Sequence, residues 1–396
     1  MKFLHCVLDE KFIAGIYEII EKTGTGEHEF ICFNQFHQSV RYLTGPLAEK
    51  VRIFTSRRKF RKRLLAADYD VLFIHSLKAV DLKILPQIPS QIKVWWSSWG
   101  YDIYSNSQIW KNSSDLAPCR RFAPLTAALN AQRGFSLKKA LKNLIMQCGF
   151  LLLSPERFFM SRKQFEKAVA RIDYCSTVLP AEFEDLKKNP FFKAEFMSFT
   201  VPPPQWVCDN IRVQRAPTDK RNVLVGQAAA AAMNHLDAFE LLRGKLPENA
   251  DVIVPLSYGD KEYANIVERK GCELFGTHMQ GLRKFMPLQE YMDLLYSCNS
   301  AIFYSYRQQA LGNINLLLAF GKKVFLPRES CTWRFFREKG VRIFSLEEIS
   351  AEELSTPLSK EEVENNRQHL TDYDFAAMIQ TFQKNYEIIK NEVKHF

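Results

Sequence analysis

The sequence predicts two successive open α/β domains, each built on a parallel β-sheet. Three observations lead to this fold class. The chain has 396 residues, which is too long for one ordinary hydrophobic core and suits two domains. Short apolar segments alternate with helical patterns along both halves, as in βα units. Between the two series, Pro202-Pro203-Pro204 and the polar stretch 215–221 cannot continue a central strand or helix, so they predict a linker.

The first domain is expected over residues 1–205, with helices such as Phe12–Lys22 and Lys59–Ala67 between its strands. Its predicted strands are Lys2–Leu8, Glu29–Phe33, Val51–Phe54, Val71–His75, Val94–Ser98, Tyr174–Leu179 and Met197–Val201.

The second domain is expected over residues 218–370, and the segment 371–396 is expected to carry a helix, about Phe375–Val393, that packs back on the first domain. The predicted strands of the second domain are Asn222–Gly226, Asp251–Leu256, Glu273–Gly276, Ala301–Ser305, Lys323–Leu326 and Arg342–Phe344. Its predicted helices are Met233–Arg243, Lys261–Lys270, Leu288–Ser297, Gly312–Phe320 and Thr332–Lys339.

The composition, with 46% hydrophobic and 25% charged residues, is that of a folded globular protein and excludes a disordered or collagen-like chain. Nine cysteines without a Cys-x-x-Cys pair favour a reducing cytosol over a disulfide framework. The N-terminus lacks the apolar core of a signal peptide, and the longest apolar run is roughly half of what crosses a bilayer. We therefore expect a cytoplasmic protein without a transmembrane helix.

The net charge of +10 is concentrated in one part of the chain. Between Arg120 and Arg171, eleven basic residues face two acidic ones, a balance of +9. In this predicted insert of the first domain, residues 106–171, apolar and basic residues interleave at helical spacing, which favours a pair of helices lying on an anionic membrane surface. Helices that pack on their own domain are the alternative. We expect no nucleic acid partner, because the sequence has no zinc finger and no helix-turn-helix.

In open parallel sheets ligands bind beyond the carboxyl ends of the strands, so residues that follow strands are the candidates for binding. Gly226 and Gln227 end the first strand of the second domain, and Asn234 and His235 lie where the next helix begins. Free N–H groups at such a turn favour a diphosphate. A tight strand-to-helix turn without a ligand is the alternative.

The strongest local pattern follows the strand Ala301–Ser305. Arginine and a helix dipole suit phosphate, and side-chain amides suit sugar hydroxyls, so this segment predicts a sugar-nucleotide site. Farther along, a carboxylate beyond the strand Lys323–Leu326 suits a diol. The residues concerned are Tyr306, Arg307, Gln308, Gln309, Gly312, Asn313 and Glu329.

In the first domain, Trp99 and Tyr101 follow a strand and suit stacking on an acceptor sugar. Asp102 is the preferred general base for an acceptor hydroxyl, and His75 is its rival. Two Asp-x-Asp triplets, Asp68–Asp70 and Asp372–Asp374, lie away from the carboxyl ends of the strands. We therefore predict no metal ion and no cofactor.

These motifs resemble the family-56 glycosyltransferases, bacterial 4-acetamido-4,6-dideoxygalactose transferases that act on lipid-linked intermediates of enterobacterial common antigen. The resemblance covers about Val225–Phe344 and rests on Gly226-Gln227 with Asn234-His235, and on Val254-Pro255 with Tyr258. It also rests on Tyr306–Gln309 with Gly312, on Arg328-Glu329 with Trp333, and on Trp99–Asp102 with His75. Where the family has small polar residues, this chain has Ala228–Ala232.

The resemblance implies a GT-B architecture and a metal-independent transfer of a deoxy-aminosugar from a TDP- or UDP-sugar. The implied acceptor is a polyprenyl-diphosphate-linked saccharide at the inner face of the cell membrane, in surface polysaccharide synthesis. Tyr258 joins the predicted donor-binding residues through this resemblance. Alternatives are a non-catalytic nucleotide-binding or scaffolding module with a degenerate fold, which the alanine tract favours, and an epimerase or phosphorylase-like enzyme.

Overall fold

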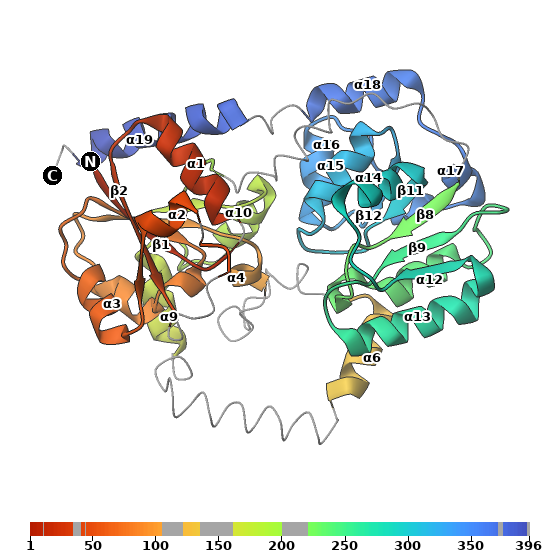
Figure 1. Ribbon diagram of the computed structural model, residues 1–396, viewed down its shortest axis with the longest axis horizontal. Helices are drawn as coiled ribbons and strands as arrows, with labels where there is room; N and C mark the ends of the chain where they lie inside the picture. The colour runs from red at the N-terminus through yellow and green to blue at the C-terminus, as the bar shows by residue number, and fades with distance from the viewer. Residues whose placement is uncertain are drawn as a thin grey trace. The chain divides into compact units, whose positions relative to one another are not determined.

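The computed structural model describes residues 1–10, 12–34, 41–43, 45–104, 122–134, 161–199, 221–370 and 375–393. The chain divides into two compact units (Figure 1). Unit 1 contains Met1–Leu116, Cys148–Pro204 and Tyr373–Phe396, and unit 2 contains Ala117–Gln147 and Gln205–Asp372. The predicted linker before residue 221 and most of the predicted insert, 106–121 and 135–160, lie outside the described residues.

Unit 1 is built on a seven-stranded parallel sheet in the order β3-β2-β1-β4-β5-β6-β7. The strands are β1 Lys2–Val7, β2 Glu27–Phe33, β3 Val51–Phe54, β4 Val71–His75, β5 Lys93–Ser97, β6 Tyr174–Ser176 and β7 Glu195–Phe196. The seventh strand was predicted at Met197–Val201, and this is wrong. The ladder next to β6 is formed by Glu195 and Phe196, while Met197 and Phe199 are buried in the core.

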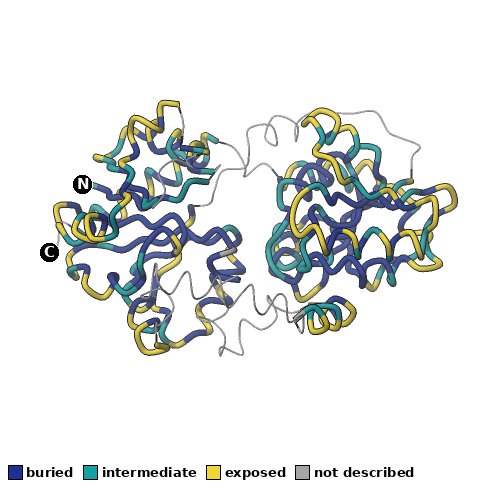
Figure 2. The backbone as a smooth tube through the Cα atoms, turned by 60° about the horizontal axis from the view of Figure 1, so that its bottom comes forward, coloured by how far each residue is buried: buried dark blue, intermediate teal, exposed yellow. Residues whose placement is uncertain are grey.

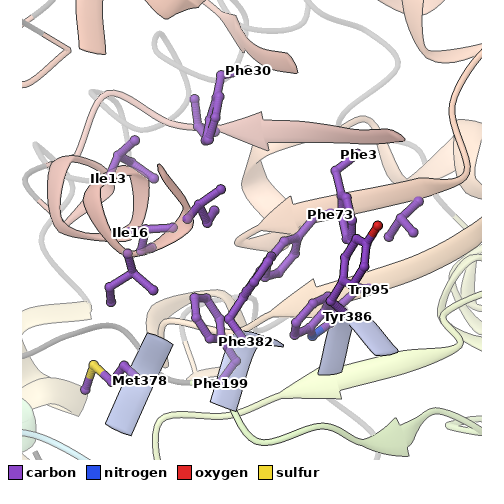
Figure 3. Packing of buried hydrophobic residues seen from close by; sticks show 14 of the residues in the cluster. Phe3, Ile13, Ile16, Phe30, Phe73, Trp95, Phe199, Met378, Phe382 and Tyr386 are labelled. Carbon is purple, nitrogen blue, oxygen red and sulfur yellow. The ribbon is translucent and has the colours of Figure 1, made fainter. Parts of the chain in front are cut away.

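Helices cover both faces of this sheet (Figure 1). They are α1 Ile13–Thr23, α2 Pro46–Lys50, α3 Arg57–Leu64, α4 Tyr101–Tyr104, α9 Arg162–Ala170, α10 Pro180–Lys187 and α19 Phe375–Val393. The last helix of the chain, α19, lies against α1 and places Phe382 against Phe3 and Trp95 of the sheet (Figure 3). Burial of each such side chain contributes roughly 1.5–3 kcal/mol. The C-terminal helix is therefore part of the core of unit 1.

Unit 2 has a six-stranded parallel sheet in the order β10-β9-β8-β11-β12-β13. Its strands lie deep inside the unit, and its helices expose their outer faces (Figure 2). The strands are β8 Asn222–Val225, β9 Val252–Pro255, β10 Met279–Leu282, β11 Cys298–Ile302, β12 Lys323–Leu326 and β13 Phe344–Ser345. The α-helices are α6 Pro124–Gly134, α12 His235–Leu242, α13 Lys261–Phe275, α14 Leu288–Ser297, α15 Leu311–Ala319, α16 Cys331–Glu338, α17 Ala351–Ser355 and α18 Lys360–His369.

The predicted strand Glu273–Gly276 is wrong. Helix α13 runs through this segment to Phe275, and Gly276, with φ of +57°, ends it. The third strand of the unit is instead β10, which lies at one edge of the sheet. Its Gly281 lies against the side chain of Glu268 from α13. A glycine in a four-residue strand gives a weak strand signal, which explains why the pattern was missed.

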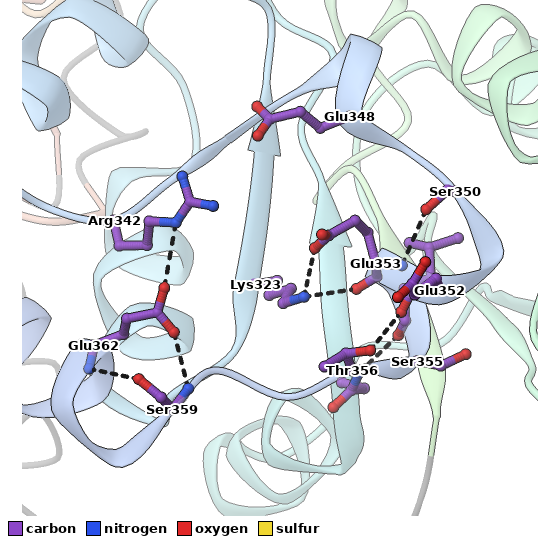
Figure 4. Close-up of polar contacts among 12 residues, drawn as sticks. Lys323, Arg342, Glu348, Ser350, Glu352, Glu353, Ser355, Thr356, Ser359 and Glu362 are labelled. Atoms are coloured by element: carbon purple, nitrogen blue, oxygen red, sulfur yellow. Dashed lines mark hydrogen bonds and ion pairs between the residues drawn. The ribbon is translucent and has the colours of Figure 1, made fainter.

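The C-terminal part of unit 2 is fixed by ion pairs and helix caps (Figure 4). The buried Lys323 of β12 donates to the backbone oxygen of Glu353 at 3.1 Å and also pairs with its carboxylate. Ser359 and Glu362 form a capping box at the start of α18, and Glu362 also pairs with Arg342. These contacts attach α17 and α18 to the sheet without involving its carboxyl edge.

One helix of the predicted insert, α6, packs on α12 of unit 2, whereas the whole insert was expected in the first domain. Asp237 of α12 accepts the backbone N–H groups of Leu125 and Thr126, at 2.8 and 3.0 Å, and the Thr126 hydroxyl at 2.7 Å. At the other end, Arg133 pairs with Asp260 and Glu262. The first turn of α6 is thus capped by another helix, a contact that sequence spacing does not reveal.

Candidate active site

In unit 2 the chain connections diverge at the carboxyl ends of β8 and β11. These two strands are neighbours, but the chain leaves β8 toward β9 on one side and β11 toward β12 on the other. Where connections diverge in this way, open α/β sheets bind their ligands. The segments after β8, β9, β11 and β12, which carry the predicted donor-binding residues, therefore meet at one edge of the sheet.

The turn after β8 is shaped by a glycine and a histidine. Gly226 has φ of +69°, and a Cβ atom placed there would lie 2.5 Å from Nε2 of His235. His235 is fully buried, and burial lowers its pKa to about 3, so the ring is neutral. Its Nδ1 lies 3.3 Å from the hydroxyl of Tyr263. Gly226 is thus required by close packing against His235.

Asn234 links this turn to two other segments. Its side-chain N–H₂ donates to the backbone oxygen of Tyr304 after β11, at 2.7 Å, and its Oδ1 accepts from Ala123 N at 3.0 Å. The residue is fully buried and in the left-handed region, with φ of +48°. Asn234 therefore positions the turns after β8 and β11 against each other.

The alanine tract Ala228–Ala232 pairs with the turn after β9. Ala229 N donates to the backbone oxygen of Tyr258 at 2.9 Å, and Asp260 N donates back to Ala229 O at 2.8 Å. A Cβ atom at Gly259 would lie 2.4 Å from the same oxygen. The absence of a side chain at Gly259 allows the two turns to approach, so the backbone of the tract has a structural role.

The segment after β11 leads into an uncapped helix. The Ser305 hydroxyl lies 3.0 Å from the backbone oxygen of Arg307 and 2.9 Å from Oε1 of Gln309, which folds the loop. Helix α15 then begins after Ala310, whose φ is +63°, and no described side chain caps its first turn. The N–H groups of Leu311, Gly312 and Asn313 carry the partial positive charge of the helix terminus, which favours an anion.

Burial separates the predicted donor-binding residues into two groups. The first group is buried and shapes the site from inside the unit: Gly226, Asn234, His235, Tyr306 and Asn313. Within it, the side-chain amide of Asn313 donates to the Tyr291 hydroxyl at 2.7 Å. Positions with exposed surface are Gln227, Tyr258, Arg307, Gln308, Gln309, Gly312 and Glu329.

In unit 1, Asp102 is a fully buried carboxylate with three donors. It accepts from Leu77 N at 3.0 Å, from Trp96 Nε1 at 2.9 Å and from Trp99 N at 2.9 Å. Burial raises its pKa, and these hydrogen bonds oppose the shift. Because these three donors occupy its oxygens, Asp102 links the segments after β4 and β5.

His75, the rival base, ends β4 and is also fully buried. Its Nε2 lies 3.0 Å from Nδ1 of His5, whereas its Nδ1 has no partner among the described residues. Burial lowers its pKa to about 3. Trp99 is 9% exposed and meets Phe12 edge-on, and the side chain of Tyr101 lies outside the described residues.

One titratable group at the carboxyl edge of the first sheet was missed. The carboxyl group of Glu182 of α10 is buried. It accepts hydrogen bonds from the hydroxyl of Tyr104 and, at 2.9 Å, from Leu179 N. Burial raises its pKa to about 7. In the sequence, Leu179-Pro180 followed by Glu182 is typical of a helix start. The raised pKa of this carboxyl group follows from its tertiary environment, which the sequence does not show.

Within the described ranges, no three His, Cys, Asp or Glu side chains gather closely enough to hold a metal ion. The described helices include none with the length and apolar character needed to cross a membrane.

Comparison with known proteins gives one family match. Residues 187–392, slightly more than half of the chain, match the family described as "4-alpha-L-fucosyltransferase glycosyl transferase group 56".

Solved structures of low sequence identity share the fold. The N-terminal domain of trehalose-6-phosphate phosphatase from Candida albicans is 10% identical, with a TM-score of 0.57 over 100% of this chain and 97% of that chain. A glycosyltransferase from Rickettsia africae is 12% identical, with a TM-score of 0.56 over 98% of both chains. Anabaena HepE, solved with UDP and glucose, is 12% identical, with a TM-score of 0.55 over 99% and 100%. The two parallel-sheet units form the GT-B fold, as predicted.

Proposed function

This chain belongs to glycosyltransferase family 56, and we propose that it transfers a deoxy-aminosugar from a TDP- or UDP-sugar to a polyprenyl-diphosphate-linked saccharide. Enterobacterial common antigen or a related bacterial surface polysaccharide is the proposed pathway. The observation that carries the proposal is the carboxyl edge of the second sheet, where the uncapped start of α15 and the Arg307 segment follow β11.

The diphosphate of the donor binds at the first turn of α15. Backbone N–H groups of residues 311–313 and the guanidinium of Arg307 stabilise the negative charge that grows on the leaving diphosphate. Gln308 and Gln309 bind sugar hydroxyls, Tyr258 and Gln227 contact the nucleotide, and Glu329 accepts a diol. These cationic and N–H groups do the work that a divalent metal does in other glycosyltransferases, so the reaction needs no metal.

The acceptor hydroxyl is deprotonated in unit 1 by His75, with Trp99 and Tyr101 beside the acceptor. The choice of His75 over Asp102 is supported by the Nδ1 of the histidine, which has no partner among the described residues, and by the three donors on the carboxylate. General base catalysis of this kind typically contributes about 10²–10⁴-fold to the rate.

The basic segment 120–171 brings the enzyme to the inner face of the cell membrane, where a lipid-linked acceptor resides. Among its described cations, Arg133 binds Asp260 and Glu262, Arg171 binds Asp173, and Arg162 pairs with Glu166 on its own helix. The remaining cations attract anionic lipid. Co-sedimentation with vesicles tests this, and equal binding to neutral and anionic vesicles contradicts it.

Turnover of a panel of nucleotide-sugars tests the proposed reaction. It is measured as the release of the nucleoside diphosphate, with and without EDTA. We expect a TDP- or UDP-deoxy-aminosugar to be consumed at the same rate in both conditions. Arg307→Ala is expected to reduce the rate by at least about 100-fold. The matched control, Arg269→Ala on the exposed side of α13, keeps the wild-type rate. An EDTA-sensitive rate, or full activity of Arg307→Ala, contradicts the proposal.

A further inference from the structure

Three histidines form a continuous hydrogen-bonded chain on one face of the first sheet. His5 of β1 lies between Phe30 of β2 and Phe73 of β4 in the register of the sheet. His28 and His75 occupy the diagonal positions two residues away on these neighbouring strands. Nε2 of His5 is 2.9 Å from Nδ1 of His28, and Nδ1 of His5 is 3.0 Å from Nε2 of His75. The chain runs from the carboxyl end of β4 toward the amino end of β2.

The far end of this chain fixes the proton on every ring. Nε2 of His28 contacts the backbone oxygen of Thr25, at 2.5 Å, and a carbonyl oxygen only accepts, so this nitrogen carries hydrogen. Burial lowers the pKa of all three rings, and each is neutral. A neutral ring has one N–H group, so Nδ1 of His28 accepts from Nε2–H of His5. Nδ1 of His5 then accepts from Nε2–H of His75.

The result is an unprotonated Nδ1 on His75, buried and without a partner among the described residues. A buried acceptor atom without a hydrogen bond costs about 1–3 kcal/mol. It lies at the carboxyl end of β4, beside β1, where the connections of the first sheet diverge. An unprotonated nitrogen without a partner at this position can accept a hydrogen bond from a hydroxyl group.

We propose that His5 and His28 are positioning residues that hold the Nδ1 of His75 unprotonated for the acceptor hydroxyl and relay the abstracted proton to His28. This inference rests on the proposed function, in which His75 is the base. As the glycosidic bond forms, the bond between the anomeric carbon of the donor sugar and the diphosphate breaks, and the nucleoside diphosphate leaves with the electron pair. The acceptor O–H bond breaks at the same time, and its proton binds Nδ1 of His75. The Nε2 proton of His75 moves to Nδ1 of His5, and the Nε2 proton of His5 moves to Nδ1 of His28.

The positive charge thereby leaves the deepest ring. His5 and His75 have no exposed surface, whereas His28 is only half-buried, and the Glu21 carboxylate and the Thr25 oxygen favour its charged form. The amino group of Met1 opposes it. After the product leaves, the proton returns along the same chain and passes from Nδ1 of His75 to a water molecule. A fully buried histidine acts as a base in this way without keeping the charge.

Nitrogen NMR of ¹⁵N-histidine-labelled full-length protein without substrate tests the arrangement. We expect the shift of an unprotonated nitrogen at Nδ1 of both His5 and His75 at neutral pH. A proton on Nδ1 of His75 overturns the inference. This measurement needs no sugar, so it is independent of the test of the proposed function. If no nucleotide-sugar is turned over, the proposed function is contradicted, and the NMR result still shows whether the histidine chain holds Nδ1 of His75 unprotonated.

Two variants separate positioning from proton relay. In His28→Asn the side-chain oxygen still accepts from His5 but takes up no proton, so we expect the tautomer of His75 to persist and kcat to fall by about tenfold or more, with KM for the donor unchanged. His5→Phe keeps the stacking on Phe30 but loses both roles, so the tautomer becomes mixed and kcat falls further. The control His278→Asn, at an exposed site of unit 2, behaves as wild type. A wild-type kcat in His28→Asn overturns the relay.

Discussion

At the scale of single residues, burial separates residues that the sequence places together. Asn234 and His235 follow a strand beside Gly226, as phosphate-binding residues do. The side chain of Asn234, however, hydrogen-bonds inside unit 2, and the ring of His235 is buried against Gly226. In the proposed function these two residues shape the turn, and the ligand is bound by Arg307 and the first turn of α15. Sequence position predicts the edge of the sheet, whereas only the structure shows that Asn234 is hydrogen-bonded inside the unit.

Gly226→Ala tests this supporting role. A left-handed backbone costs alanine roughly 1–2 kcal/mol, and the contact with His235 adds to this. We expect the free energy of unfolding of unit 2 to fall by about 3 kcal/mol and nucleotide affinity to fall with it, measured by denaturant unfolding and calorimetry.

The matched control is Gly244→Ala. Gly244 has the same φ of +69°, but a Cβ atom there meets nothing within 4 Å. We expect only the backbone cost and unchanged nucleotide binding. Equal destabilisation of the two variants would show that the contact with His235 has no energetic weight.

At the scale of elements, strands with a strong sequence pattern were predicted correctly. The predicted bounds of β3, β4 and β12 are confirmed, because short segments rich in β-branched and aromatic residues between polar turns give a clear strand pattern. Edge strands β7 and β10 were misplaced, since two- and four-residue strands with polar residues or glycine carry little pattern. The docking of α6 on α12 and the histidine chain depend on strand order and tertiary packing, which one sequence does not contain.

The start of α10 gives a pH-dependent prediction. Burial raises the pKa of Glu182 from 4.5 to about 7, so between these values the folded protein holds a proton that the unfolded chain releases. Stability contributed by this proton is complete below about pH 4.5 and declines as the pH rises to about 7.

Glu182→Gln removes this titration while keeping an acceptor for Leu179 N. Relative to wild type, the variant should gain about 2–3 kcal/mol in the free energy of unfolding of unit 1 between pH 4.5 and pH 8. Denaturant unfolding at both pH values measures the difference. A gain that does not vary with pH would mean that Glu182 ionises normally in the folded protein.

At the scale of the whole molecule, both units follow one plan. In each sheet the first strand of the unit is central, the next two lie on one side, and the fourth begins the other side. Each unit therefore has one carboxyl edge suited to a ligand, which agrees with a donor in unit 2 and an acceptor in unit 1. Not all of the net charge of +10 is available for a membrane surface, because Arg133 of the basic segment 120–171 pairs with Asp260 and Glu262 and holds α6 inside unit 2.

The central claim is that a nucleoside diphosphate binds at the start of α15 without a metal. Calorimetric titration of wild type and Arg307→Ala with TDP and with UDP, in EDTA, tests it most directly. We predict binding of one of the two nucleotides to wild type and at least about tenfold weaker binding to the variant. No binding at millimolar nucleotide, or equal affinity of the two proteins, would contradict the account and favour a scaffolding module that keeps the fold without the ligand.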